Sequence, residues 1–182
     1  CKLGATIIPA TLQLTKKDIS YRANSADVKA MVCVNDPYVV EQTEEALAEA
    51  PSIKNTILVD GQREGWISFD SLIENESETF ERPTGDAGVT SKDIMLIYFT
   101  SGTTGNPKAV MHNFAHPLGH ILTAKYWQQV QENKLHMSVT DSGWAKFGWG
   151  KIYGQWIAGA TVFCYDMDKF IPAKLLQHMQ DY

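Results

Sequence analysis

The residues best suited to chemistry lie in one loop that combines hydroxyls, glycines and a lysine. The loop follows the apolar run Ile94 to Phe99, and its residues are Thr100, Ser101, Gly102, Thr103, Thr104, Gly105, Asn106, Pro107 and Lys108. Glycines lack a Cβ and can take positive φ, so successive backbone N–H groups can turn inward around an anion. The hydroxyls add hydrogen-bond donors and Lys108 adds a cation. The segment therefore predicts a clamp for a polyphosphate.

Two other interpretations of this loop are a Walker loop and an ordinary turn. A Walker loop needs Gly-x-x-x-x-Gly-Lys-Ser/Thr, whereas Gly102 and Gly105 are three residues apart and Ala109 follows the lysine. An ordinary surface turn rich in Ser, Thr and Gly stays open as the alternative. Several hydroxyls and a lysine directly after a buried strand favour a functional loop.

A second group of candidates combines aromatic side chains with glycines between Trp144 and Trp156. Those that could line a pocket for a hydrocarbon chain are Trp127, Trp144, Phe147 and Trp149. Lys146 lies among them and could meet a carboxylate. The alternatives are aromatics that pack a helix against a sheet, favoured for Tyr153 and Trp156, and a lysine whose amine reaches solvent.

Three histidines, His112, His116 and His120, recur at four-residue intervals. On one continuous helix they would share a face, as metal ligands do. Pro117 belongs in the first turn of a helix, which places His112 outside it. We therefore prefer a role at a helix end, at the surface or in packing over a metal site.

Short apolar runs alternate with segments of helical period, as a parallel sheet covered by helices requires. The predicted strands are Ala5 to Pro9, Ala30 to Val34, Thr56 to Val59, Ile94 to Thr100, His136 to Thr140 and Thr161 to Tyr165. The fold class predicted is α/β, with a mostly parallel β-sheet flanked by helices.

Helices are predicted between these strands. Thr15 and Asp18 form a capping pair at the start of the first helix. The second helix carries Val39, Val40, Thr43, Leu47 and Ala50 on one face, and a third carries Ile171, Leu175, His178 and Met179. The polar stretch from Glu74 to Lys92 is expected to be a surface connection.

Composition restricts the class of protein. The 182 residues carry a formal net charge of -5, which argues against a nucleic-acid-binding surface. No apolar run has the length of a membrane span. Cys33 and Cys164 lie in apolar runs far from each other and from Cys1, so we expect reduced core thiols and a cytoplasmic protein.

The loop resembles the hallmark of the adenylate-forming superfamily, Tyr-Thr-Ser-Gly-Thr-Thr-Gly-x-Pro-Lys-Gly, from Thr100 to Lys108. Ala109 stands where glycine is common. The resemblance covers the whole chain, since the segments Lys2 to Ala10, Thr140 to Trp144 and Tyr153 to Ala160 are also similar to acyl-CoA synthetases. The medium-chain acyl-CoA synthetases fit best.

This resemblance implies that residues 1–182 are part of the large N-terminal AMP-binding domain, truncated at both ends. It implies ATP, Mg²⁺, coenzyme A and a small carboxylic acid as ligands, and residues 100–108 as the ATP-binding loop. It places no catalytic residue in the chain, so we expect the chain alone to be inactive. Open sheet edges would favour association into homo-oligomers.

Other functions stay open at this point. A vestigial or scaffolding chain that still binds nucleotide would show the same loop. So would an aryl-acid ligase, an adenylation domain that loads a carrier protein, or a luciferase-like oxidase. The Ser142 to Trp144 region favours formation of an acyl-CoA.

Overall fold

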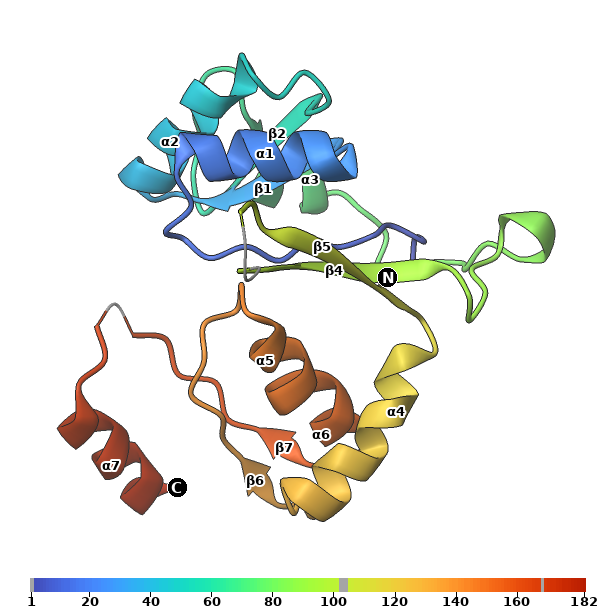
Figure 1. Cartoon of the computed structure of the whole chain (residues 1–182), viewed down its shortest axis with the longest axis vertical. Coiled ribbons are helices and arrows are strands. Elements are labelled where there is room, and N and C mark those ends of the chain that lie inside the picture. Colours follow the sequence, from blue (N-terminus) through green and yellow to red (C-terminus); the bar gives the residue numbers. More distant parts are fainter. Residues whose placement is uncertain (1, 102–104, 168) are drawn as a thin grey trace.

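A computed structural model describes residues 2–101, 105–167 and 169–182. Its elements form an upper part, a central hairpin and a lower part (Figure 1). The upper part contains α1 (Lys16–Ala26), β1 (Ala30–Val34), α2 (Pro37–Leu47), β2 (Asn55–Val59), β3 (Ile67–Ser68) and α3 (Phe69–Ile73). The hairpin consists of β4 (Ile94–Thr100) and β5 (Lys108–Asn113). The lower part contains α4 (His116–Leu122), β6 (Leu135–His136), α5 (Ala145–Phe147), α6 (Tyr153–Ile157), β7 (Thr161–Val162) and α7 (Pro172–Asp181).

The upper part is a parallel sheet in the order β1-β2-β3, with α1 and α2 packed against each other. The predicted capping pair is confirmed, because the Thr15 side chain accepts from Asp18 N and the Asp18 carboxylate accepts from Thr15 N at 3.1 Å. At the start of α2 the Asp36 side chain accepts from Val39 N, and Pro37 occupies the first turn. Ile19 of α1 and Ala46 of α2 are buried in one cluster. Local capping and an apolar face thus determine both helices.

The central strand β4 is buried from Met95 to Tyr98. It pairs with β5 in antiparallel register, from Ile94↔Asn113 to Thr100↔Lys108. The apolar pattern of the sequence did not predict β5. A connection as short as residues 101–107 can join antiparallel strands, whereas a parallel pair needs a crossover of about a dozen residues or more.

The predicted strand Ala5 to Pro9 is wrong as a full strand. Only Ile7 forms a β-bridge, parallel to Leu96 of β4. Ile7 N donates to Met95 O at 3.0 Å, and Ile97 N donates to Ile7 O at 2.9 Å. The N-terminal segment therefore borders β4 on the edge opposite β5.

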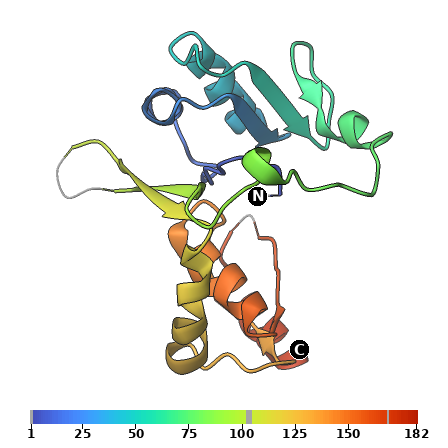
Figure 2. The ribbon, with the colours of Figure 1, turned by 90° about the vertical axis from the view of Figure 1, so that its right-hand side faces the viewer.

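The lower part is a βαβ unit in which β6 and β7 pair in parallel (Figure 2). Both strands are shorter than predicted, because regular pairing ends at His136 and Val162 and the following residues run on without it. The crossover joins α5 and α6 through a π-helical turn, Gly148–Ile152. A second π-helical turn, Thr123–Trp127, follows α4. The mixed α/β class is confirmed, with two parallel sheets and one antiparallel hairpin among the described residues.

The cysteine and surface predictions have mixed outcomes. Cys33 is buried, and burial raises the pKa of its thiol, which disfavours the reactive thiolate. Cys164 is exposed, so its assignment to the core is wrong. The stretch from Glu74 to Lys92 is mostly exposed and irregular, as expected. No helix among the described residues is long and apolar enough to cross a membrane.

Candidate functional site

The predicted phosphate loop connects the two central strands. Thr100 is the last residue of β4 and pairs with Lys108, the first of β5, and the Thr100 hydroxyl donates to Lys108 O at 3.5 Å. The two ends of the loop are therefore held side by side. Gly105 has φ +89°, in the left-handed region that favours glycine, and a Cβ added there would meet no described atom within 4 Å.

The described loop residues are accessible to a ligand. Thr100, Ser101, Gly105, Asn106 and Lys108 are exposed, and Pro107 is half-buried. The remaining predicted members, Gly102, Thr103 and Thr104, lie outside the described residues. The Ser101 hydroxyl and the Lys108 amine are thus accessible to an anion.

Helix α1 fixes the far side of the loop. The Tyr21 hydroxyl donates to Pro107 O at 3.0 Å, and the Tyr21 ring meets the Phe99 ring edge to face. The Arg22 guanidinium lies 5.0 Å from the centre of the same Phe99 ring. Burial lowers the pKa of Arg22. Tyr21 and Arg22 were not predicted as site residues. The only indication of such a role in the sequence is that both lie outside the apolar face of α1.

The structure separates the aromatic candidates into two groups. Trp127 and Trp144 are 79% and 57% exposed, and Lys146 is also exposed. Phe147 and Trp149 are half-buried. The exposed group is free to contact a ligand, whereas Trp149 packs against other rings.

Three of those rings belong to His112, His116 and His120, and the others to Tyr98 and Tyr153. The histidine ring centres lie within 4.8 Å of the Trp149 ring, and His120 stacks on it at 4.6 Å with an interplanar angle of 7°. His116 and His120 are joined through their Nε2 atoms at 3.2 Å. As expected from Pro117, His112 lies outside α4, on β5. Among the described residues no group of His, Cys, Asp and Glu has the geometry to hold a metal.

The electrostatics of this His–Trp149 cluster favour neutral rings. Burial, followed by the neighbouring histidines, lowers the pKa of His112 and His120 below the ordinary value of 6.5. Two tyrosines that face Trp149 are also held neutral, because burial raises the pKa of Tyr98 to about 12 and also raises that of Tyr153. The cluster therefore prefers to stay uncharged.

We predict that acid weakens the packing of this cluster. As the pH falls below 6.5, the histidines of the unfolded chain bind protons. In the folded protein, His112 and His120 stay neutral until the pH reaches their lowered pKa values. The thermal midpoint of the protein should therefore fall with pH in that window. The variant His112→Gln/His120→Gln should flatten the slope, and His178→Gln, on α7, should keep it. An unchanged slope in the double variant would contradict the prediction.

Glycine allows the crossover helix to approach α4. A Cβ on Gly154 would lie 2.8 Å from His120 O and 3.1 Å from the Ala124 Cβ. The buried Gln155 side chain donates to that of Gln128 in the same interface. Gly154 therefore permits the close approach of these two helices.

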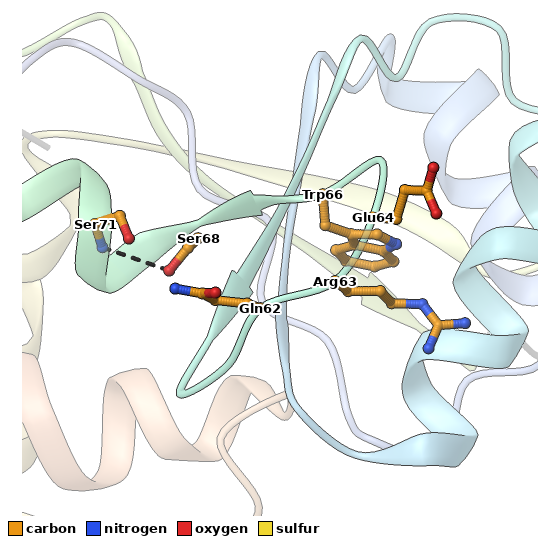
Figure 3. Close-up of a pocket in the computed structure, with 6 residues that line it drawn as sticks. All are labelled: Gln62, Arg63, Glu64, Trp66, Ser68 and Ser71. Atoms are coloured by element: carbon orange, nitrogen blue, oxygen red, sulfur yellow. Dashed lines mark hydrogen bonds between the residues drawn. The ribbon is translucent and has the colours of Figure 1, made fainter.

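A cavity of about 410 Å³ lies elsewhere, beside β3 and α3 (Figure 3). Arg63, which lines it, is already paired with Glu44 at 2.7 and 2.8 Å. Trp66 donates to the same carboxylate at 2.9 Å. None of its lining residues belongs to the phosphate loop or to the aromatic candidates. A polar, internally paired pocket of this kind gives no reason to place the substrate there.

The sequence profile of the family described as "AMP-binding enzyme" matches residues 1–182. The chain is 33% identical to an acyl-coenzyme A synthetase of the rat, Rattus norvegicus, named ACSM4, over 100% of this chain and 30% of that protein. It is 34% identical to the human ACSM4, with the same coverage. The crystal structure of an anthranilate CoA ligase with anthranoyl-AMP superposes with a TM-score of 0.83 at 19% identity, covering 100% of this chain and 34% of that one. The latter likeness shows the fold alone.

These relatives correct the predicted location. Both ACSM4 proteins are named as mitochondrial, which contradicts the cytoplasmic expectation. The physical reason is that reduced cysteines exclude oxidising compartments without distinguishing among the others. The chain spans about 30% of the length of these curated relatives.

Proposed function

Because the chain belongs to the family of AMP-binding enzymes, we propose that the full-length protein is an ATP-dependent acid–CoA ligase that forms AMP. The substrate carboxylate attacks the α-phosphorus of ATP and pyrophosphate leaves. The thiol of coenzyme A then attacks the acyl carbon, and AMP leaves as the thioester forms. The observation that carries the proposal is the loop between Thr100 and Lys108, closed by strand pairing and braced by Tyr21.

In this proposal the loop serves the first step. Backbone N–H groups and hydroxyls hold the β- and γ-phosphates, and Lys108 offsets the charge that develops as pyrophosphate departs. The described loop residues include no carboxylate. Mg²⁺ that enters with ATP would therefore take no carboxylate ligand from these residues.

The acid in this proposal is a medium-length or branched aliphatic acid. The aromatic candidates Trp127, Trp144, Phe147 and Trp149 would form walls for its chain, and burial of apolar surface contributes about 25 cal/mol per Å². Lys146, exposed beside them, would meet a carboxylate. Support comes from the 33% identity to the rat acyl-coenzyme A synthetase.

We also propose that residues 1–182 do not complete the reaction alone. The phosphate loop contributes binding and charge stabilisation, and we assign no general acid, general base or nucleophile to this chain.

We propose as well that the protein associates into a homo-oligomer. Association would cover apolar side chains such as Met111 of β5, which is 63% exposed.

ATP–pyrophosphate exchange by the full-length protein tests the proposed function. Straight-chain, branched and aromatic acids would each be offered with Mg²⁺ and labelled pyrophosphate, and thioester formation would be followed after coenzyme A is added. Exchange that requires a medium-length aliphatic acid is the expected result. A folded protein that binds ATP and shows no exchange with any acid would overturn the proposal in favour of a binding role. Exchange with aromatic acids alone would indicate an aryl-acid ligase.

A further inference from the structure

A small cavity of about 30 Å³ lies where β6 and β7 end. Its walls include Ser138 and Thr140, which follow β6, and Phe163 and Tyr165, which follow β7. The carboxyl ends of parallel strands are where α/β sheets bind ligands, because side chains from successive strands converge there. The hydroxyls of three of these residues give the cavity a polar lining.

Lys151 closes the cavity from the crossover helix. The whole residue is only 6% exposed, which is rare for a lysine. Its amine lies 5.4 Å from the centre of the Phe147 ring, on the same side of the helix. Lys151 therefore connects the cavity to a residue already proposed to line the acyl site.

The positive charge of Lys151 has no acidic partner among the described residues. The ion pairs found there are Lys16–Glu49, Lys29–Asp27 and Arg63–Glu44. Asp141, the acid that follows Thr140, accepts instead from the Thr11 hydroxyl and Gly143 N. A ring face attracts an ammonium group more weakly than a carboxylate does. The site is therefore suited to an anionic oxygen group.

We propose that Lys151 binds a second carboxylate, at the end of the acid substrate remote from the reacting carboxyl. This inference rests on the proposed function. The cavity holds one small terminal group and not a hydrocarbon chain, because its volume exceeds that of a water site only slightly. Hydroxyls of Ser138, Thr140 and Tyr165 donate to the same carboxylate. An unsubstituted alkyl end would leave both the amine and the hydroxyls without partners, which disfavours it.

The test compares aliphatic diacids of three to eight carbons with their monomethyl esters in ATP–pyrophosphate exchange by the full-length protein. We expect at least one diacid to exceed its monoester in kcat/KM by about tenfold or more, since the ester removes only the terminal charge. Lys151→Met should abolish this preference by lowering kcat/KM for the diacid to the value for its monoester. Lys174→Met, an exposed lysine on α7, is the matched control and should keep the preference.

Stability provides an independent readout. If the Lys151 amine has no bound partner in the free protein, Lys151→Met should leave the thermal midpoint unchanged or raise it. A saturating diacid without ATP should raise the midpoint of the wild type and not that of the variant. Lys151→Gln serves if the methionine variant does not fold. Exchange with plain acids but with no diacid preference, or a large loss of stability in both variants, would overturn the inference and leave the proposed function standing. Absence of exchange with every acid would instead overturn the proposed function. A wild-type thermal midpoint that the diacid does not shift would overturn the inference.

Discussion

Lys108→Ala is expected to lower kcat/KM for ATP in the adenylation step by about 100-fold, the typical effect of removing one group that stabilises transition-state charge. Lys108 is exposed at the first position of β5, and its backbone is fixed by pairing with Thr100. The amine can therefore reach the phosphates from a rigid base, and its loss should affect chemistry more than folding. Pyrophosphate exchange at varied ATP concentration measures the effect.

The matched control for this variant is Lys92→Ala. Lys92 is exposed in the connection before β4, and its replacement makes the same change in net charge. This variant should retain full exchange activity and an unchanged thermal midpoint. If Lys108→Ala loses less than about threefold, or if both variants lose equally, Lys108 has no specific role at the phosphates.

Gly143→Ala is expected to destabilise the folded protein by about 3 kcal/mol or more, at the upper end for overpacked sites. A Cβ at Gly143 would lie 2.1 Å from Thr11 N and 2.3 Å from the Ala10 carbonyl carbon. Both atoms belong to backbone, which cannot rotate away as a side chain can. The same contact is reinforced by the Thr11 hydroxyl, which donates to the Asp141 carboxylate at 3.2 Å. The thermal midpoint should fall by about 5 to 10 °C.

The matched control is Gly119→Ala in α4. A Cβ there meets no described atom within 4 Å, so the change should be neutral or stabilising by up to about 1 kcal/mol through helix propensity. A midpoint for Gly143→Ala that equals that of Gly119→Ala would show that the two segments do not approach as closely as described. Because Thr11 precedes α1 and Gly143 precedes α5, this contact joins the upper and lower parts of the molecule.

Much of the local structure could be predicted from residues close in sequence. The capping pair Thr15 and Asp18 specifies where α1 begins, and the apolar run Ile94 to Phe99 specifies β4. Pro117 marked the start of α4 correctly. Each of these signals operates within a few residues, so no distant contact is needed to detect it.

Predictions that depended on pairing were less accurate. The segment Ala5 to Pro9 has the composition of a strand, yet a single bridge at Ile7 is all that pairs with β4. In contrast β5 carries little apolar alternation, and its burial pattern is largely exposed, but register with β4 makes it a strand. Whether a segment forms a strand depends on the strand with which it pairs, and the local sequence does not identify that partner.

By itself the sequence predicted a phosphate-binding role for the loop, because the hydroxyls, glycines and lysine between Thr100 and Lys108 are contiguous. It also determined the α/β class through the alternation of apolar runs and helical periods. Only the tertiary structure decided that Tyr21 braces the loop, that three histidines surround Trp149, and that Lys151 lines a cavity without an acidic partner among the described residues. Those contacts join residues that are distant in sequence or lie on different elements, so packing alone brings them together.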